Sequence, residues 1–326
     1  MKKAVKYALI GTVAAGCTAA AAVVGFKMAL RGILHEALDR KELPIIEKTR
    51  ERLMNNAVPG DTLARAEQLT AVLRDGAAET VAIDSFDGTH LVGHIHRAEN
   101  PKRIIVAMHG WRSSWTRDYA VISPFFWAND STVLYAEQRG QGMSDGAFMG
   151  FGMVERHDCV AWVNYAVEHI SSELPIYLVG VSMGASTVLM ASGDEKLPPN
   201  VRGIIADCGF TSAKEIWRHV STDNLHLAFD GPVEKEATAL CKKWLALEPD
   251  AYSTLDAMAV CKTPILFIHG KSDGFVPCSM SEENYAACRA PKRILLVDGA
   301  DHGLSYIVDQ ATYEAEVLDF WKTYDA

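Results

Sequence analysis

The stretch from Ile176 to Leu189 constrains this chain more than any other. It reads Ile-Tyr-Leu-Val-Gly-Val-Ser-Met-Gly-Ala-Ser-Thr-Val-Leu, an apolar run that meets Gly-x-Ser-x-Gly and continues into small residues. This pattern predicts a buried strand, a sharp turn and a helix. Gly180 and Gly184 are expected where side chains would collide between that strand and helix. The turn lifts the hydroxyl of Ser182 above the sheet edge, and the helix N-terminus favours negative charge beside it.

Further strands are predicted at intervals after residue 79. An Asp-Gly turn at 87–88 joins the first two into a hairpin. Helical stretches at 154–170, 182–192 and 279–289 separate the later ones. The predicted strands cover residues 81–86, 90–96, 103–108, 132–136, 176–179, 201–207, 264–268 and 293–297. A hairpin followed by alternating strands and helices predicts an α/β fold, with a mostly parallel eight-stranded sheet and helices on both faces.

Two segments fall outside this alternation. Residues 31–78 carry apolar side chains at helical spacing among charged ones, which predicts a helical spacer that packs on the main domain. A second helical segment, at about 211–260, interrupts the domain formed by residues 79–326. It follows a strand that ends at Asp207, so we expect it to overhang the carboxyl ends of the strands as a cap.

The N-terminus has the pattern of a membrane segment. Lys2, Lys3 and Lys6 precede an uncharged run from Tyr7 to Phe26. At 1.5 Å per residue, about 20 residues just span a bilayer core. Residues 1–30 therefore predict a signal anchor that holds the protein on a membrane, and the preceding lysines favour an extracytoplasmic main domain. A cleaved signal peptide, which would give a secreted protein, and a lipoprotein-like sequence ending at Cys17 are the alternatives.

Charge and composition exclude several classes of protein. The formal net charge is −9 and no basic stripe offsets it, which argues against a nucleic-acid partner. Beyond Cys17, six cysteines without a Cys-x-x-Cys motif are interpreted mostly as free core thiols. His90, His94 and His96 share one strand face, but no matching ligand spacing supports zinc, so we expect exposed side chains and no metal. No phosphate loop or dinucleotide fingerprint indicates a cofactor.

Two further residues suit the serine. A serine hydroxyl is a weak nucleophile that needs a base, and that base needs a carboxylate to orient it. His302, in Gly-Ala-Asp-His-Gly after the last predicted strand, is the candidate base. Asp273, in His-Gly-Lys-Ser-Asp-Gly-Phe-Val-Pro after the preceding strand, is the candidate carboxylate. Its rival Asp301 adjoins His302, and neighbours on a loop point apart.

Attack on a carbonyl also needs donors for the oxygen that becomes negative. One predicted donor is the backbone N–H of Met183, the residue after the serine. The other is the N–H of Trp111, in the loop His109-Gly110-Trp111 after a predicted strand. Gly110 lets that backbone approach closely, and His109 is interpreted as scaffolding.

These motifs together resemble those of a known family. Met108-His-Gly-Trp, Glu137-Gln-Arg-Gly-Gln-Gly-Met-Ser, Gly-Val-Ser-Met-Gly, His-Gly-Lys-Ser-Asp-Gly-Phe-Val-Pro and Gly-Ala-Asp-His-Gly resemble successive motifs of the α/β-hydrolase superfamily, from about residue 79 onward. Within it, the chain resembles bacterial serine aminopeptidases and cinnamoyl or feruloyl esterases. The resemblance implies the α/β-hydrolase fold. Glu137 departs from the pattern, because Asp is commoner there, and we expect residues 137–144 to shape a loop near the site.

The sequence thus predicts a membrane-anchored serine hydrolase that cleaves small carboxylic esters through an acyl-enzyme intermediate. A serine aminopeptidase-like peptidase or amidase is the first alternative. It would need an acidic cap residue to hold the amine of a short peptide, and the candidates are Glu215, Asp223, Glu234 and Glu236. A non-catalytic, membrane-tethered binding protein on a hydrolase fold is the second. The oligomeric state is left open.

Overall fold

The computed structural model describes residues 25, 28, 31–32, 35–41, 60–76 and 78–325. Apart from position 25, the uncharged run at 7–26 lies outside these residues, and so does Cys17. Within the described part of the chain, no helix has the length and apolar character needed to span a bilayer. The signal anchor and its two alternatives therefore stay predictions.

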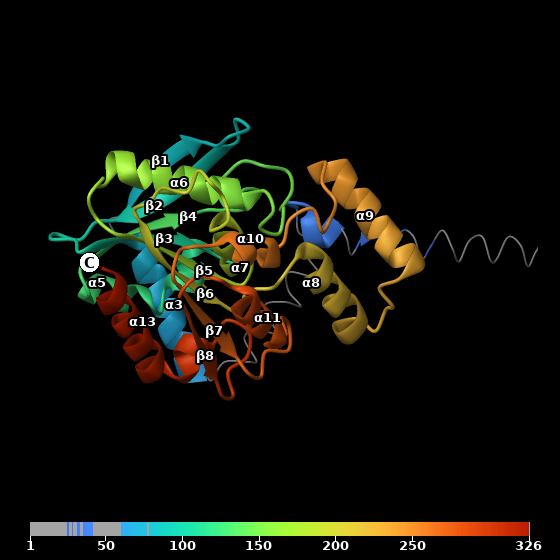
Figure 1. Ribbon diagram of the computed structural model, residues 1–326. Coiled ribbons are helices and arrows are strands. Elements are labelled where there is room, and N and C mark those ends of the chain that lie inside the picture. Colours follow the sequence, from blue (N-terminus) through green and yellow to red (C-terminus); the bar gives the residue numbers. More distant parts are fainter. Residues whose placement is uncertain are drawn as a thin grey trace, which may run out of the picture.

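The centre of the molecule is one eight-stranded sheet in the order β1-β2-β4-β3-β5-β6-β7-β8 (Figure 1). Only β2 runs antiparallel to its neighbours, so the predicted mostly parallel sheet is confirmed. Every residue of β3, β4 and β7 is buried, as expected for apolar runs covered on both faces. The strands are β1 Glu79–Asp84, β2 His90–His96, β3 Arg103–Met108, β4 Ser131–Ala136, β5 Ile176–Val181, β6 Val201–Asp207, β7 Ile265–Gly270 and β8 Lys292–Val297.

Helices cover both faces of the sheet, and the alternation of strand side chains separates two cores. Ile104 and Val106 of β3 pack into one core, whereas Ile105 and Ala107 pack into the other. The first core includes residues from α6 Glu155–His169, α7 Met183–Ala191, α10 Thr254–Val260 and α11 Ser279–Ala287. The second includes residues from α3 Gly60–Asp75, α4 Trp115–Tyr119, α5 Ser123–Ala128, α12 Ser305–Val308 and α13 Gln310–Tyr324.

A smaller helical lobe projects from this body (Figure 1). It contains α8 Ala213–His219, the π-helical turn η1 Val220–Asn224 and α9 Gly231–Leu245. Its apolar residues form a third core with Met183, Phe210 and Val276, which lie in or near the segments that follow β5, β6 and β7. The lobe thus rests on the carboxyl ends of these strands. The predicted insertion at about 211–260 also includes α10, which instead packs against α7 in the main body.

Two other predictions concern segments packed on this frame. Within the predicted spacer at 31–78, α3 packs against α4 and buries Leu73, while Leu38 is fully buried in the third core. The six cysteines that the structure describes are free thiols, and five of them are buried. This agrees with their interpretation as core thiols.

Candidate active site

Ser182 sits on a strained turn between β5 and α7. Its backbone has φ 56° and ψ −118°, a conformation that L residues rarely adopt. A Cβ on Gly180 would collide with the Gly184 carbonyl, and a Cβ on Gly184 would collide with the Met108 carbonyl. Both glycines are therefore required, as predicted, where the helix crosses the strands. The Ser182 N–H is held by the Asp207 carbonyl at 2.9 Å, which fixes the turn to β6.

The structure brings Ser182, His302 and Asp273 together at the carboxyl edge of the sheet. The Oγ of Ser182 lies 3.0 Å from Nε2 of His302. Nδ1 of the same imidazole lies 2.7 Å from Oδ2 of Asp273. Ser182 follows β5, Asp273 follows β7 and His302 follows β8, so parallel strands deliver all three to one edge. The imidazole thus bridges a hydroxyl and a carboxylate.

Asp273 is held on both of its oxygens. Oδ1 accepts hydrogen bonds from the backbone N–H groups of Phe275 and Val276, at 2.9 and 2.8 Å. Oδ2 also contacts Nε2 of His269 at 3.1 Å. The sequence analysis missed His269, although it stands in the same motif, because a buried imidazole at a strand end has no distinctive pattern. Burial alone would raise the pKa of Asp273, but His269 and His302 outweigh it and hold that pKa below its usual value.

His302 has two partners that affect its charge. Burial opposes the imidazolium, but acidic neighbours raise the pKa of His302 above its ordinary value: Cys208 would do so as a thiolate, and Asp273 does so as a carboxylate. Burial raises the pKa of the Cys208 thiol to about 11, so the thiol is neutral near pH 7. Asp273 is therefore the partner that supplies negative charge there.

This electrostatic arrangement predicts the acidic limb of a pH–rate profile. A base works only when neutral, and a raised pKa keeps His302 protonated to a higher pH. We expect kcat/KM for an ester to be half-maximal above about pH 6.5, the ordinary value for histidine, and to fall as the pH decreases further. Cys208→Ser should leave the limb in place, because a neutral thiol contributes no charge. A limb below pH 6 in the unmodified protein would contradict this assignment.

The two predicted oxyanion donors belong to Met183, directly after the serine, and to Trp111, in the loop after β3. Neither the N–H of Met183 nor that of Trp111 donates to another residue in the described part of the chain. The neighbouring Gly110 N–H, in contrast, is bound by Asp118 at 2.7 Å. Met183 is the first residue of α7, where helix N–H groups have no partner within the helix. Both N–H groups are thus without a protein acceptor in the described ranges, as their predicted role requires.

His109 supports this loop. Its Nδ1 lies 2.8 Å from the Gly110 carbonyl, and its Nε2 accepts from the Gln138 N–H at 3.2 Å. The Gln138 side chain also donates to the His109 carbonyl and accepts from Thr187 of α7 at 3.0 Å. His109 is fully engaged by the protein itself, which agrees with its predicted role as scaffolding.

Several known proteins are similar to this chain in sequence or in fold. The family model described as serine aminopeptidase, S33, matches residues 99–228. The uncharacterized protein YqkD of Bacillus subtilis is 26% identical over 227 residues, which cover 70% of this chain and 73% of the relative. The Pyrococcus furiosus esterase Pf2001 superimposes with a TM-score of 0.62 at 19% identity, covering 78% of this chain and 96% of the esterase. Est1E of Butyrivibrio proteoclasticus, solved with ferulic acid bound, superimposes with a TM-score of 0.57 at 19% identity. The match covers 73% of this chain and 98% of Est1E.

The chain has the α/β-hydrolase fold. Within this fold, aromatic side chains of the main body and of the helical lobe pack together in the third core, which also contains Met183. Trp217 of α8 packs edge-on against Phe151 at 5.3 Å between ring centroids. Phe275 packs edge-on against the His302 ring at 5.1 Å and so limits its rotation. These phenylalanine and tryptophan rings belong to the apolar cluster that also contains Met183, the residue after the serine.

The loop that begins at Glu137 packs against β2. Glu137 is buried, and its Oε1 lies 2.8 Å from Nε2 of His94. Its Oε2 accepts from the Met143 N–H, close to Gly142. The expectation that the β2 histidines are exposed is therefore wrong for His94, which stacks on Trp115 at 4.3 Å. The reason is that this face of β2 is covered by α4 and by the Glu137 loop.

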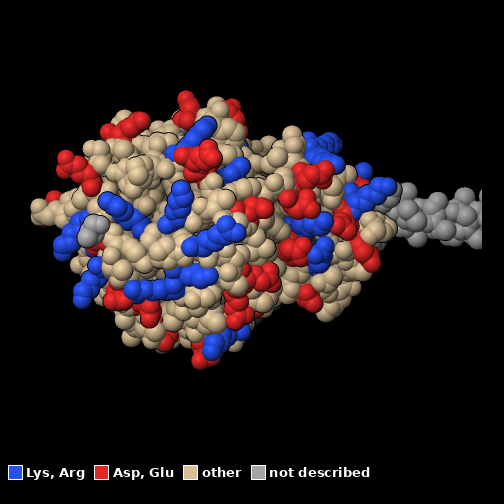
Figure 2. Space-filling model, in the orientation of Figure 1, with Lys and Arg blue, Asp and Glu red and all other residues tan. Residues whose placement is uncertain are grey.

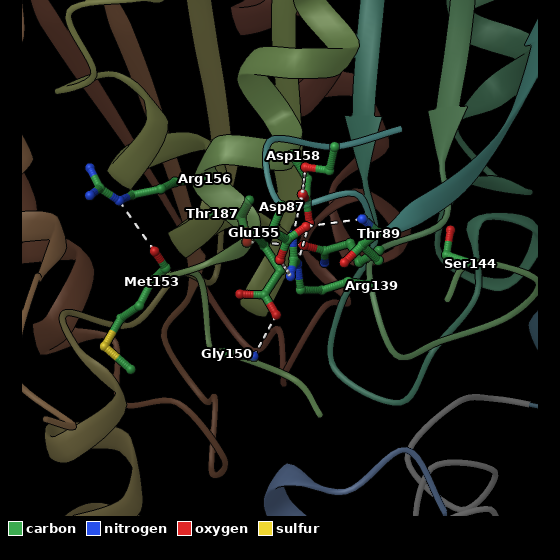
Figure 3. A network of polar contacts seen from close by, with 12 residues as sticks. Asp87, Thr89, Arg139, Ser144, Gly150, Met153, Glu155, Arg156, Asp158 and Thr187 are labelled. Carbon is green, nitrogen blue, oxygen red and sulfur yellow. Dashed lines mark hydrogen bonds and ion pairs between the residues drawn. The ribbon is translucent and has the colours of Figure 1, made fainter. Parts of the chain in front are cut away.

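Arg139, in the same loop, forms a second network that is separate from that of Glu137 (Figure 3). Its guanidinium makes two 2.6 Å bonds to Asp158 of α6 and a 2.9 Å bond to Asp87 of the hairpin turn. Nearby, the buried carboxylate of Glu155 accepts from the Gly150 N–H at 2.5 Å and from the Gly152 N–H at 2.9 Å. Arg139 thus joins the first hairpin to α6 and contacts neither Ser182 nor His302.

On the face shown in Figure 2, acidic and basic side chains are interspersed, and neither sign forms a continuous field. Among the described residues, one group has the geometry to hold a metal ion: Cys208, Asp273 and His302, whose ligand atoms lie within 4.8 Å of one another. His302 and Asp273 already bind each other, so a cation there would have to break their hydrogen bond.

Proposed function

We propose that this α/β-hydrolase cleaves small carboxylic esters through an acyl-enzyme intermediate. Ser182 Oγ attacks the acyl carbon while Nε2 of His302 takes the hydroxyl proton. His302 then gives that proton to the leaving alcohol as the ester C–O bond breaks. A water molecule, deprotonated by the same imidazole, attacks the acyl-enzyme, and the carboxylic acid leaves as Ser182 regains its proton.

The observation that carries the proposal is the hydrogen-bonded chain from Ser182 through His302 to Asp273, with separations of 3.0 and 2.7 Å. These are the distances over which a general base takes a proton. Asp273 favours the tautomer with a proton on Nδ1, which leaves Nε2 free to accept from Ser182. The backbone donors on Asp273 hold this carboxylate in place during proton transfer.

The N–H groups of Met183 and Trp111 would bind the oxyanion. Negative charge develops on the substrate oxygen when the tetrahedral intermediate forms, and fixed donors stabilise it most in an apolar setting. Loss of one such donor typically costs about 10²- to 10³-fold in kcat. Since the Gly110 N–H is occupied by Asp118, Trp111 is the donor that this loop offers.

The peptidase alternative lacks its expected anchor in the cap. A free carboxylate would have to receive the substrate's amine, but each of the four candidates has a basic partner. They are Glu215 with Arg218, Asp223 with His219, Glu234 with Lys214 and Glu236 with Arg31. This favours esters over free-amine peptides, although the matching family model is named for aminopeptidases.

Parallel assays test the proposal. We expect turnover of p-nitrophenyl acetate or butyrate, little turnover of aminoacyl p-nitroanilides, and labelling by a fluorophosphonate that peptide mapping assigns to Ser182. Faster cleavage of an anilide than of any ester would favour the peptidase. A folded protein that is neither labelled nor active on either class would favour a non-catalytic binding protein.

A further inference from the structure

A short segment far from Ser182 in the sequence directly contacts residues 109–112, here called the oxyanion loop because it contains the proposed donor Trp111. Residues 35–41, here called the N-terminal segment, present backbone carbonyls to Trp111 and Arg112. Nε1 of Trp111 donates to the Ala37 carbonyl at 2.8 Å. The Arg112 guanidinium donates to the Glu36 carbonyl at 2.9 and 2.6 Å and to the Asp39 carbonyl at 2.7 Å. Arg112 is also ion-paired with the Glu36 carboxylate at 3.2 Å.

Arg112 needs this support because its backbone is strained. It has φ 48°, in the left-handed region that costs a residue with a side chain about 1–2 kcal/mol. Such a conformation persists only where surrounding contacts over-determine it. The side chains of Arg112 and Glu36 are only 4% and 6% exposed, so their contacts are shielded from water. The strained residue immediately follows Trp111, whose N–H is the proposed oxyanion donor.

The N-terminal segment is itself held on its other side. The N–H of Arg40 donates to the Ala147 carbonyl at 2.8 Å, and the N–H of Met149 donates to the Leu38 carbonyl at 2.7 Å. The Arg40 side chain donates to the carbonyls of Ser144 and Gly142 at 2.6 and 2.7 Å. Leu38 is fully buried in the third core. The N-terminal segment is therefore fixed to the main body by these hydrogen bonds and by the burial of Leu38.

We propose that Arg112, which donates hydrogen bonds to the carbonyls of Glu36 and Asp39, is a positioning residue. It holds the Trp111 N–H in the orientation that binds the oxyanion. The inference rests on the proposed esterase mechanism. It makes the N-terminal segment a working part of the active site, not only a spacer. The guanidinium donates to the Glu36 carbonyl from both Nε and Nη2 and to the Asp39 carbonyl from Nη2, and the single nitrogen of lysine cannot reproduce this planar arrangement. The geometry of the oxyanion loop thus depends on residues outside the region that the family model matches.

The test uses full-length protein with Arg112→Lys, and kcat is normalised to active sites titrated with a fluorophosphonate. Lysine keeps the charge beside Glu36 but loses the fork. We expect kcat for a p-nitrophenyl ester to fall about 10- to 100-fold while KM changes less than about 3-fold, because a misplaced donor weakens only transition-state binding. Glu36→Gln, which keeps both backbone carbonyls, should lower kcat less than Arg112→Lys does.

Arg40→Lys is the matched control, since it removes a similar fork from the same segment but on the side facing residues 142–144. It should lower the melting temperature yet leave kcat per titrated site within about 3-fold. Equal losses of kcat in both lysine variants, or an Arg112→Lys variant within 2-fold of the parent, would overturn the inference. If Arg112→Lys fails to fold, Trp111→Phe decides, because it removes the bond to Ala37 while keeping an aromatic ring and the backbone N–H, and it should still lower kcat. An inactive parent would instead reject the esterase mechanism.

Discussion

Ser182→Ala is expected to lower kcat for ester hydrolysis by about 10⁴- to 10⁶-fold and to abolish fluorophosphonate labelling. The alanine removes the hydroxyl oxygen that is proposed to form the acyl-enzyme, while the Met183 and Trp111 donors stay in place. Residual activity should therefore exceed that of the uncatalysed reaction, because the oxyanion donors still act on attack by water. Initial rates at saturating p-nitrophenyl ester measure the effect.

Two further variants sharpen this prediction. His302→Ala alone should be nearly as inactive as Ser182→Ala, and the double variant should be no worse than either, since the two groups act as one unit. Ser186→Ala is the matched control: this serine lies one turn along α7, and its hydroxyl bonds to the backbone of Phe210. It should retain activity within several-fold. Additive losses at Ser182 and His302 would mean that they do not act on the same step.

Arg139→Met is expected to lower the free energy of unfolding by about 3–5 kcal/mol. The Asp158 side chain is only 1% exposed, and Arg139 is its ionic partner. Removing the guanidinium would leave a buried carboxylate without its counter-charge, and burial already raises the pKa of Asp158. The α6 helix and the first hairpin would also lose the group that joins them (Figure 3). Urea denaturation, followed by far-UV circular dichroism, measures the loss.

The partners of Arg139 provide the controls. The Asp87 side chain is 37% exposed, so Asp87→Asn should cost under about 1 kcal/mol. The double variant Arg139→Met, Asp158→Leu should recover part of the loss, because an apolar pair can replace a buried ion pair. Arg139→Met protein that unfolds within 1 kcal/mol of the parent would show that the network contributes little to stability.

Much of this molecule could be predicted because the relevant signals are local. Buried strands appear as uninterrupted apolar runs, and the hairpin appears as Asp87-Gly88 between two such segments. Ser182, Asp273 and His302 each follow a strand, and parallel strands bring their carboxyl ends to one edge. The convergence of these three side chains was therefore predictable from their order along the chain.

Other features had no local signal. The burial of His94 depends on α4 and on Glu137, which follows it by 43 positions. The assignment of α10 to the main body depends on its contacts with α7, since its own sequence resembles any short capped helix. Likewise, the sequence does not show that each acidic cap residue forms an ion pair with a basic side chain, because these partners are selected by packing.

The amino-acid sequence alone determined the strand order along the chain, the strained serine turn and the three side chains at the sheet edge. These depend on periodicity, glycine sterics and chain direction, which neighbouring residues encode. Only the tertiary structure decided that the carbonyls of Glu36 and Asp39 accept hydrogen bonds from Arg112, a residue 76 positions after Glu36 in the chain. Backbone carbonyls are the same in every residue, so only packing can select which of them receive a hydrogen bond.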